Sequence, residues 1–311
     1  MHTASWYAST AHARPAPTPL RGTQRVDVGI LGGGLTGLSA ALELAQAGYR
    51  VALLEAQQVG WGASGRSGGQ VIFGFGCEQS QLTAQLGLAD SRRLFDWSIE
   101  GIRLIHERCR AFAIDADWHD GHAHVAINRR QADKLKIWRD ELATRFDYPL
   151  DWWEADQLGT VLASRRYLGA LFDPRSGHLH PLNYTLGLAR AARQLGVQVF
   201  EFSPVRRLLR GPKPTLLTEH GGLECDFVVL AGNAYVRGIA PELDRRIMPV
   251  GTYIGATEPL GEAVAHTLIR NGMAVADINW ALDYFRLSHD HRLLFGGRAS
   301  YSALPPPNLR G

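Results

Sequence analysis

The chain has 311 residues, of which 45% are hydrophobic and 20% are charged, so it can bury a large core and would normally divide into two domains. Its formal net charge of +3 is too small, and its basic residues are too dispersed, to indicate a nucleic-acid-binding protein. The three cysteines include no C-x-x-C pair, which favours free thiols in a reducing compartment over a disulfide framework or a metal site.

Residues 1–25 are rich in Ala, Pro, Thr and Ser, and we interpret them as an N-terminal extension. They contain no apolar run of the length that a signal peptide or a membrane span requires. Residues 26–47 are more apolar, but their glycines and Glu43 fit a nucleotide-binding unit better than a membrane helix. We therefore expect no transmembrane segment and a cytoplasmic location.

The next segment has the order of a dinucleotide-binding unit. An apolar, β-branched run at 26–31 predicts a buried parallel strand. The glycines after it have the G-x-G-x-x-G spacing: Gly32, Gly34 and Gly37. In this motif the first glycine allows a sharp turn, the second lets the backbone approach a pyrophosphate, and the third lets helix and strand pack closely. Helix formers over 38–47 then place a helix N-terminus, with its unpaired N–H groups, at the diphosphate position.

A second strand is predicted over 51–54, and Glu55 stands at its end. An acid about 20 residues beyond the glycines can accept hydrogen bonds from ribose hydroxyls and repels a 2′-phosphate, which disfavours NADP. The alternative is a βαβ unit that binds nothing. We favour the binding unit because strand, glycines, helix, second strand and acid all fall in register.

Residues 60–69 form a second glycine-rich loop, with the sequence GWGASGRSGG. Its amides and hydroxyls can lie along a long cofactor, and Arg66 offers donors to a phosphate or to the electron-rich edge of a flavin. The alternative is a flexible surface loop.

Helical and strand patterns alternate through the rest of the chain. The predicted helices cover 90–110, 133–145 and 182–195, and the predicted strands cover 117–128, 166–172, 197–202 and 226–230. A turn at 220–222 separates two strands, and a hairpin joins strands at 284–287 and 292–295.

Several histidines raise the question of a metal site. His122 and His124 alternate with apolar residues, as on the polar face of a strand, and His119 precedes them. No cysteine or carboxylate set lies nearby in a known ligand spacing, so we expect no metal. His178 and His180 are either structural residues at a domain junction or residues near a substrate.

The two glycine-rich segments, GGGLTGLSAALELAQAG and LLEAQQVGWGASGRSGGQ, resemble the FAD-dependent amine and D-amino-acid oxidase superfamily. The chain most closely resembles the gamma-glutamylputrescine oxidase branch of that superfamily. Further segments fit this branch: SWYA at 5–8, GHLHPLN at 177–183, VLAGNAY at 229–235 and LDYFRL at 282–287. The resemblance covers nearly the whole chain, with a small departure at Ser67, where relatives often have asparagine.

The resemblance implies non-covalent FAD, because no histidine or cysteine matches a position of covalent flavin attachment. It implies that the cofactor is bound by both glycine-rich loops, the acid and two later segments: Gly32, Gly34, Leu35, Thr36, Gly37, Glu55, Ser64, Gly65, Arg66, Ser67, Gly68, Gly69, Gln70, Val205, Ala231 and Gly232. Val205 would contact the adenine through its backbone.

The resemblance also implies an α/β fold with two interleaved domains. A Rossmann-like FAD-binding domain of the glutathione-reductase type would take 26–85 and 178–240, and an α+β substrate domain would take 86–177 and 241–311. Relatives continue well beyond the last hairpin with a glycine-rich turn that caps the flavin. We therefore expect the C-terminal part of the fold to be missing from this chain.

The chemistry that the resemblance implies is the loss of a hydride from the α-carbon of a neutral amine to the flavin, with oxygen as the final acceptor. The protein must hold that carbon and exclude water, and it needs no catalytic triad. Candidates for the substrate pocket are Tyr253, Tyr284 and Arg286. The tyrosines can equally be core residues, and Arg286 can pair either with a substrate carboxylate or in a structural salt bridge.

Three hypotheses follow. The leading one is an FAD-dependent oxidoreductase that acts on gamma-glutamylputrescine or a related amine or amino acid. The first alternative is a non-catalytic remnant that keeps affinity for the dinucleotide. The second alternative is an NAD-dependent dehydrogenase, against which the interrupted nucleotide domain and the loop around Arg66 argue.

Overall fold

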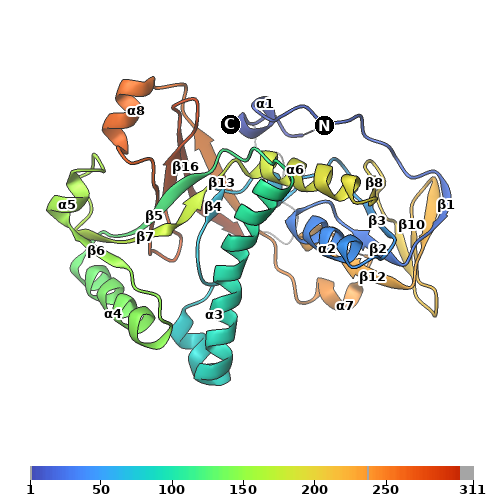
Figure 1. Ribbon diagram of the computed structural model, residues 1–311, viewed down its shortest axis with the longest axis horizontal. Helices are drawn as coiled ribbons and strands as arrows, with labels where there is room; N and C mark the ends of the chain where they lie inside the picture. The colour runs from blue at the N-terminus through green and yellow to red at the C-terminus, as the bar shows by residue number, and fades with distance from the viewer. Residues whose placement is uncertain (1, 237, 302–311) are drawn as a thin grey trace.

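The computed structural model describes residues 2–236 and 238–301, and this part of the chain contains three β-sheets (Figure 1). The first sheet is wholly parallel, with the order β12-β2-β3-β8. Its strands are β2 Val28–Leu31, β3 Val51–Leu54, β8 Gln198–Phe200 and β12 Phe227–Leu230. Helices α2 (Leu35–Gln46) and α6 (Pro181–Gln194) pack against each other beside it.

Burial of apolar side chains explains this layer. Ile30 of β2, Leu38 of α2 and Leu53 of β3 are fully buried in one cluster with residues of α6. The predicted strand, glycine turn, helix and second strand are confirmed. The helix begins at Leu35, three residues before the predicted start, because its first turn includes the glycine motif itself.

The second sheet is small and has the order β1-β11-β10-β9. Its strands are β1 Gly22–Arg25, β9 Arg207–Leu209, β10 Thr215–Leu217 and β11 Gly221–Glu224. The turn that was predicted at 220–222 lies earlier, because Gly221 and Gly222 already belong to β11 and pair with β1. Residues 22–25, predicted as part of an extension, form a paired strand.

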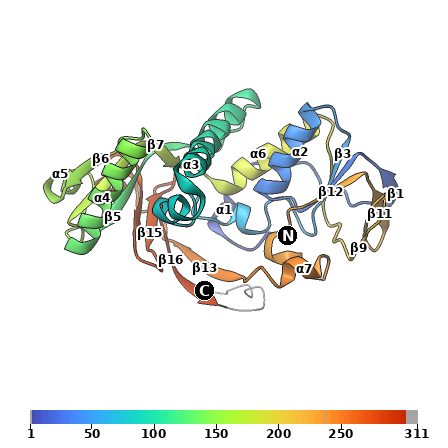
Figure 2. The ribbon, with the colours of Figure 1, turned by 90° about the horizontal axis from the view of Figure 1, so that it is seen from below.

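The third sheet has eight strands in the order β13-β16-β15-β14-β5-β7-β4, with β6 also paired to β7. Its strands are β4 Gln70–Val71, β5 His119–Ala126, β6 Asp151–Glu154, β7 Gly169–His178, β13 Val250–Ala256, β14 Ala274–Asp277, β15 Tyr284–Leu287 and β16 Leu293–Tyr301. Figure 2 shows β15, β16 and β13 together at one edge of this sheet.

Helices cover both faces of the eight-stranded sheet. They are α3 Gln79–Ala111, α4 Arg129–Arg145, α5 Ala155–Gly159 and α8 Glu262–Leu268. One core cluster joins α3 and α4 to β5 and β7, and another joins α5 and the chain after α8 to the opposite face. In Figure 1 this sheet with α4, α5 and α8 lies to the left of α3, and the two smaller sheets lie to the right.

Several predicted elements are longer in the structure. Helix α3 starts at Gln79 rather than at residue 90, and it contains a break at Gly87, where φ is +80°. Helix α4 starts at Arg129 because the side chain of Asn128 caps it by accepting from the Gln131 N–H. Strand β16 extends past Phe295, because Gly296 and the residues after it continue the pairing with β13.

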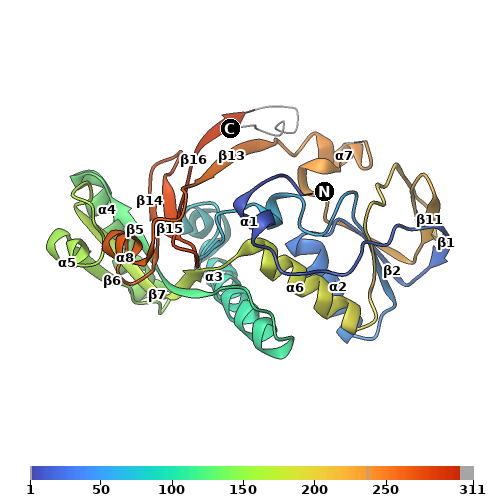
Figure 3. The same ribbon diagram turned by 90° about the horizontal axis from the view of Figure 1, so that it is seen from above.

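The N-terminal segment contacts both halves of the molecule. Helix α1 (Trp6–Ser9) packs on α6, and Tyr7 is buried with Leu182 of α6 and Leu294 of β16. Figure 3 shows the segment passing from α1 along α6 to β1. Within the residues described, no helix is both long enough and apolar enough to cross a membrane.

Candidate cofactor and substrate site

The glycine motif between β2 and α2 has a geometry that needs glycine. Gly32 has a φ of +110°, in the region that L-residues rarely adopt. A Cβ on Gly34 would lie 2.7 Å from Ser64 Oγ, and one on Gly37 would overlap the carbonyl oxygen of Gly32. Gly34 is the N-cap of α2 and has no side chain to cap the helix; Ser64 Oγ accepts from the Leu35 N–H, and the N–H groups that follow it in the first turn suit an anion.

A cavity of about 270 Å³ lies at the carboxyl ends of β2 and β3, beside the glycine motif. This is where open parallel sheets bind their ligands. Seven of the residues predicted to bind the cofactor line it: Gly32, Gly34, Glu55, Ser64, Val205, Ala231 and Gly232. Of the other predicted residues in α2, Leu35 and Thr36 are exposed in its first turn, and Gly37 is buried beneath the motif.

Glu55 lies in the cavity wall at the end of β3. Its Oε2 accepts a hydrogen bond from the Gly33 N–H at 2.7 Å, and its Oε1 accepts from the Gln57 N–H at 2.9 Å. Burial raises the pKa of the Glu55 carboxyl, although these backbone hydrogen bonds oppose the shift. Each oxygen retains a lone pair that can accept from a ribose hydroxyl.

The first half of the second glycine-rich loop is tied to the glycine motif. The Gly60 N–H donates to Gly33 O at 3.0 Å, and Ser64 Oγ accepts from the Leu35 N–H at 3.0 Å. A short 3-10 helix, η1 (Ala63–Gly65), lies here, with Gly65 buried. The Arg66 guanidinium stacks over Trp61 at 4.8 Å.

The second half of this loop leads to the eight-stranded sheet. The aromatic ring of Tyr284 lies against Gly68, and Gly69 has a φ of +70°. Gln70 starts β4, and its Nε2 donates to Val275 O at 3.2 Å. The loop therefore links the dinucleotide cavity to β14 and β15.

A family model described as "FAD dependent oxidoreductase" (DAO) matches residues 27–310. The chain belongs to the DAO family of FAD dependent oxidoreductases. Its fold is that of the family, and its cofactor is FAD, which decides against the NAD-dependent alternative.

Curated relatives match nearly the whole chain. A protein of Haemophilus influenzae named "Probable oxidoreductase OrdL" is 43% identical over 96% of this chain and 71% of its own length. The "Gamma-glutamylputrescine oxidoreductase" of Escherichia coli is 38% identical over 99% of this chain and 72% of its own length. Among solved structures, glycine oxidase from Geobacillus kaustophilus superposes with a TM-score of 0.69. It is 23% identical and covers 89% of this chain and 72% of that one, so it is evidence for the fold.

The residues present fit FAD. A Cβ at Gly34 or Gly37 would collide with Ser64 or with the Gly32 carbonyl oxygen and disturb the glycine turn, and the N–H groups in the first turn of α2 suit a diphosphate. Glu55 closes the wall where a ribose would lie. These groups would hold the adenosine and diphosphate part of the cofactor, which we call its dinucleotide end. The second glycine-rich loop continues from there to the eight-stranded sheet.

The three candidates for the substrate pocket do not share one face of that sheet. Gly296 pairs with both Tyr284 and Ile254, whereas Tyr253 pairs with Gly297. Because paired residues share a face and neighbours alternate, Tyr284 and Arg286 lie on one face and Tyr253 lies on the other. The structure therefore places Tyr253 on the opposite face of the sheet from Tyr284 and Arg286.

Tyr284 is well placed beside the cofactor loop. A Cβ on Gly296 would overlap its ring, and one on Gly68 would lie 2.6 Å from it. The ring thus occupies space that two glycines leave. Burial raises the pKa of the Tyr284 hydroxyl, and a hydrogen bond with Thr252 opposes this shift.

The histidines on β5 were interpreted as a polar face, and that interpretation was wrong. His122 is fully buried and His124 nearly so, because β5 lies between β14 and β7 and its face is covered by Phe73 and Trp138. Burial lowers the pKa of His124 to about 4. Within the described ranges, no group of three or more His, Cys, Asp or Glu side chains could hold a metal ion.

His178 and His180 lie where β7 leads into α6. His180 is the N-cap of α6, and its Nδ1 accepts from the Asn183 N–H at 3.1 Å. Its Nε2 must then carry the proton and donate to Thr10 Oγ1, 3.0 Å away. His180 therefore joins the N-terminal segment to α6.

The sequence analysis did not predict the aromatic residues in the cavity wall. Trp61 and Tyr235, the latter in the 3-10 helix η2 (Asn233–Tyr235), both line the cavity, and their ring centroids are 5.7 Å apart. Trp61 lies between Gly60 and Gly62, and this placement of a large ring between two glycines was a usable signal. Ile239, just before α7 (Pro241–Asp244), also lines the cavity.

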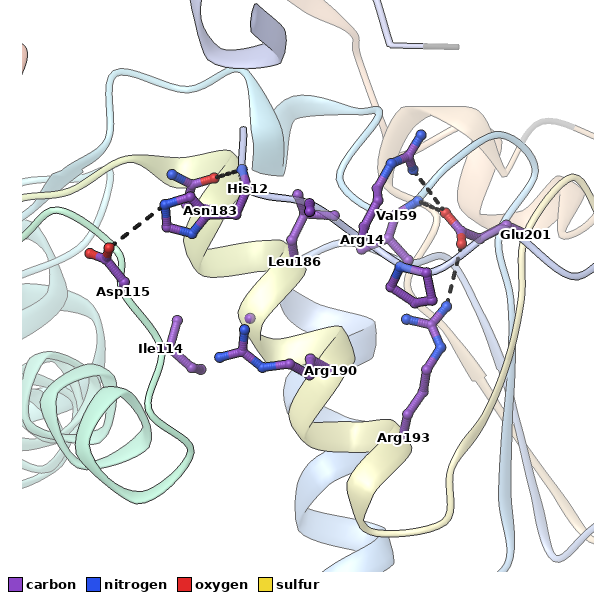
Figure 4. A pocket seen from close by; sticks show the side chains of 13 residues that line it. His12, Arg14, Val59, Ile114, Asp115, Asn183, Leu186, Arg190, Arg193 and Glu201 are labelled. Carbon is purple, nitrogen blue, oxygen red and sulfur yellow. Dashed lines mark hydrogen bonds and ion pairs between the residues drawn. The ribbon is translucent and has the colours of Figure 1, made fainter. Parts of the chain in front are cut away.

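A second cavity, of about 40 Å³, lies beside α6 on the N-terminal segment (Figure 4). The buried carboxylate of Glu201 accepts from Val59 N at 2.8 Å and pairs with Arg14 at 3.4 Å and Arg193 at 3.3 Å. Its charge is thus neutralised within the protein. This ionic group fastens the N-terminal segment to α6.

Proposed function

We propose that this chain oxidises a primary or secondary amine, with gamma-glutamylputrescine or a related amine or amino acid as substrate and oxygen as acceptor. The observation that carries the proposal is the 38% identity, over 99% of the chain, to the gamma-glutamylputrescine oxidoreductase of Escherichia coli. The fit of the glycine cradle and Glu55 to FAD supports it independently.

Bound FAD would supply the acceptor for a hydride from the carbon next to the amine nitrogen. The chain's own part is to place that carbon and to keep water away from it. Tyr284 provides a half-buried wall next to Gly68, and partial burial raises the pKa of its phenol further above neutral pH, so the phenol is protonated there. The phenol is therefore able to pack and to donate a hydrogen bond, and it does not act as a base.

We also propose that the chain forms two interleaved domains, one that binds FAD and one that binds the substrate. Residues 26–85 and 178–240 would form the FAD-binding domain, because all four strands of the parallel sheet come from these segments. Residues 86–177 and 241–311 would form the substrate domain, since they supply every strand of the eight-stranded sheet except β4. The FAD would be non-covalent, because no histidine or cysteine of the sequence matches a position of covalent flavin attachment in the superfamily that the chain resembles.

The test is anaerobic reduction of the FAD-loaded protein, followed by its visible flavin band. The expected result is rapid bleaching by gamma-glutamylputrescine, slower bleaching by putrescine and glycine, and formation of peroxide when air is admitted. If no amine bleaches the flavin while dithionite does, the proposed function is wrong.

A further inference from the structure

Arg286 is a buried cation that, in the part of the chain the structure describes, forms no ion pair with a carboxylate. Its side chain is 1% exposed. Burying a charge is costly unless hydrogen bonds replace its water. The partners of its guanidinium therefore indicate what the residue does.

Every donor of the guanidinium is used inside the protein. Nε donates to Gly68 O at 2.8 Å, and Nη2 donates to Leu179 O at 3.0 Å and to Tyr7 Oη at 3.2 Å. Nη1 donates to Leu287 O at 3.3 Å and faces His178 Nδ1 at 3.4 Å. An arginine has five N–H groups, so none remains for a substrate carboxylate.

The tautomer of His178 agrees with this assignment. Its Nε2 lies 2.8 Å from Gly272 O, and a carbonyl can only accept, so Nε2 carries the proton. Nδ1 therefore presents a lone pair to Arg286. Burial, and next the charge of Arg286, lower the pKa of His178 to about 3, which keeps the ring neutral.

The acceptors belong to segments far apart in the sequence. Tyr7 lies in α1, Gly68 in the second glycine-rich loop, and Leu179 between β7 and α6. Glycine makes the close approach possible, because a Cβ on Gly69 would lie 3.0 Å from Arg286 Nη2 and would overlap Leu179 O. Tyr284, two residues before Arg286 on the same face of β15, lies against Gly68 as well.

We propose that Arg286 is a positioning residue that fastens the Gly68–Gly69 part of the second glycine-rich loop to α1 and β15, and so sets the loop for FAD. It acts on the cofactor through Gly68 and does not touch the substrate. This role replaces the pairing with a substrate carboxylate that the sequence suggested for Arg286. It rests on FAD as the cofactor and not on the identity of the amine.

The test compares four variants: Arg286→Met, Arg286→Lys, Tyr7→Phe and, as the control, Arg292→Lys. Arg292 lies beyond the turn of the same hairpin and bonds Asp290 and Thr257 O, away from the loop. The measurement is the FAD dissociation constant of each apo-protein, from flavin fluorescence, at a temperature where circular dichroism shows it folded. No amine is present, so the result does not depend on the proposed function.

We expect the dissociation constant to rise about 30-fold in Arg286→Met and about tenfold in Arg286→Lys, because Lys keeps the charge but has only three donors for the five acceptors of the guanidinium. We expect a rise of about threefold in Tyr7→Phe, which removes one acceptor, and less than about twofold in Arg292→Lys. Affinities within about twofold of the unmodified protein in folded Arg286→Lys and Tyr7→Phe would overturn the proposal, even if Arg286→Met fails to fold.

A kinetic comparison separates positioning from substrate binding. At saturating FAD, the proposal predicts that Arg286→Lys lowers kcat and leaves KM within about twofold, for gamma-glutamylputrescine and putrescine alike. A KM that rises only for gamma-glutamylputrescine, the substrate with a carboxylate, would assign Arg286 to substrate binding and overturn the proposal.

Discussion

The two ends of the FAD site are built in different ways. The dinucleotide end is made largely from one stretch of chain, residues 28–64, in which a strand, a glycine turn, a helix and an acid follow one another. The end next to the eight-stranded sheet is assembled from α1, the second glycine-rich loop, β7 and β15. The first end depends on local backbone geometry, whereas the second depends on long-range packing. We therefore expect mutations at the first end to act mainly on FAD affinity, and mutations at the second end to act on turnover as well as, at Arg286, on affinity.

The largest effect is expected at the local end, in a comparison of two helical glycines. Gly37→Ala should weaken FAD binding about 100-fold or more, because its Cβ would overlap the Gly32 carbonyl oxygen and displace the turn. Gly101→Ala in α3 has no atom within 4 Å of the new Cβ, so it should leave FAD affinity unchanged and stabilise the helix by about 0.5–1 kcal/mol. FAD titration and thermal unfolding measure both. Equal affinities in the two variants would contradict the predicted role of the turn.

A smaller effect is expected at the assembled end. Gly296→Ala should lower kcat about 30-fold while changing the FAD dissociation constant less than about threefold, because its Cβ would push the Tyr284 ring. Gly255→Ala, on the neighbouring strand β13, meets nothing within 4 Å and is the matched control. If Gly296→Ala lost FAD affinity as strongly as Gly37→Ala, the two ends would not be separable.

Glu55 provides a finer test of the dinucleotide end. Glu55→Gln should raise the FAD dissociation constant about tenfold, because the amide has one oxygen and cannot accept from both the Gly33 and the Gln57 N–H groups. The measurement is a fluorescence titration with FAD. An unchanged dissociation constant would mean that the carboxylate contributes nothing to the cofactor.

The buried histidines predict how stability depends on pH. Burial, followed by the charge of Arg286, lowers the pKa of His178 to about 3 and that of His180 to about 4. In the unfolded chain each of these histidines binds a proton near pH 6.5, whereas in the folded chain it does not. The free energy of unfolding is therefore not reduced by these two groups above about pH 6.5. As the pH falls from about 6.5 toward the pKa in the folded state, each histidine lowers the free energy of unfolding by about 1.4 kcal/mol per pH unit.

Thermal unfolding of the apo-protein between about pH 7.5 and pH 5.5 measures this dependence. In His180→Gln the stability should fall less steeply with decreasing pH, by the contribution of one histidine, since the glutamine cannot titrate. An identical decline in this variant would show that His180 does not remain neutral in the folded protein.

The same contrast explains what the sequence could predict. The strand at 51–54, the glycine turn and the position of Glu55 were predictable, because each depends on neighbours within one βαβ unit. The face of Tyr253 was not, because it depends on the register of β13 against β16, which shifts between Gly251 and Tyr253. Periodicity along one strand cannot reveal that shift.

Burial on β5 was hidden for a similar reason. His122 and His124 have the polar side chains of an exposed face, and only the central place of β5 in the sheet makes them buried. The composition of residues 1–25 likewise suggests an extension, yet Tyr7 contacts Arg286 and residues 22–25 pair with β11. Partners more than 190 residues apart leave no local pattern.

The central claim is that both ends act on one FAD, and the most direct measurement is the amount of FAD retained per chain after the protein is saturated and desalted. We expect close to one FAD per folded chain, nearly none in Gly37→Ala, and retention close to that of the unmodified protein in Gly296→Ala. A folded, unmodified chain that retains no FAD would contradict the account.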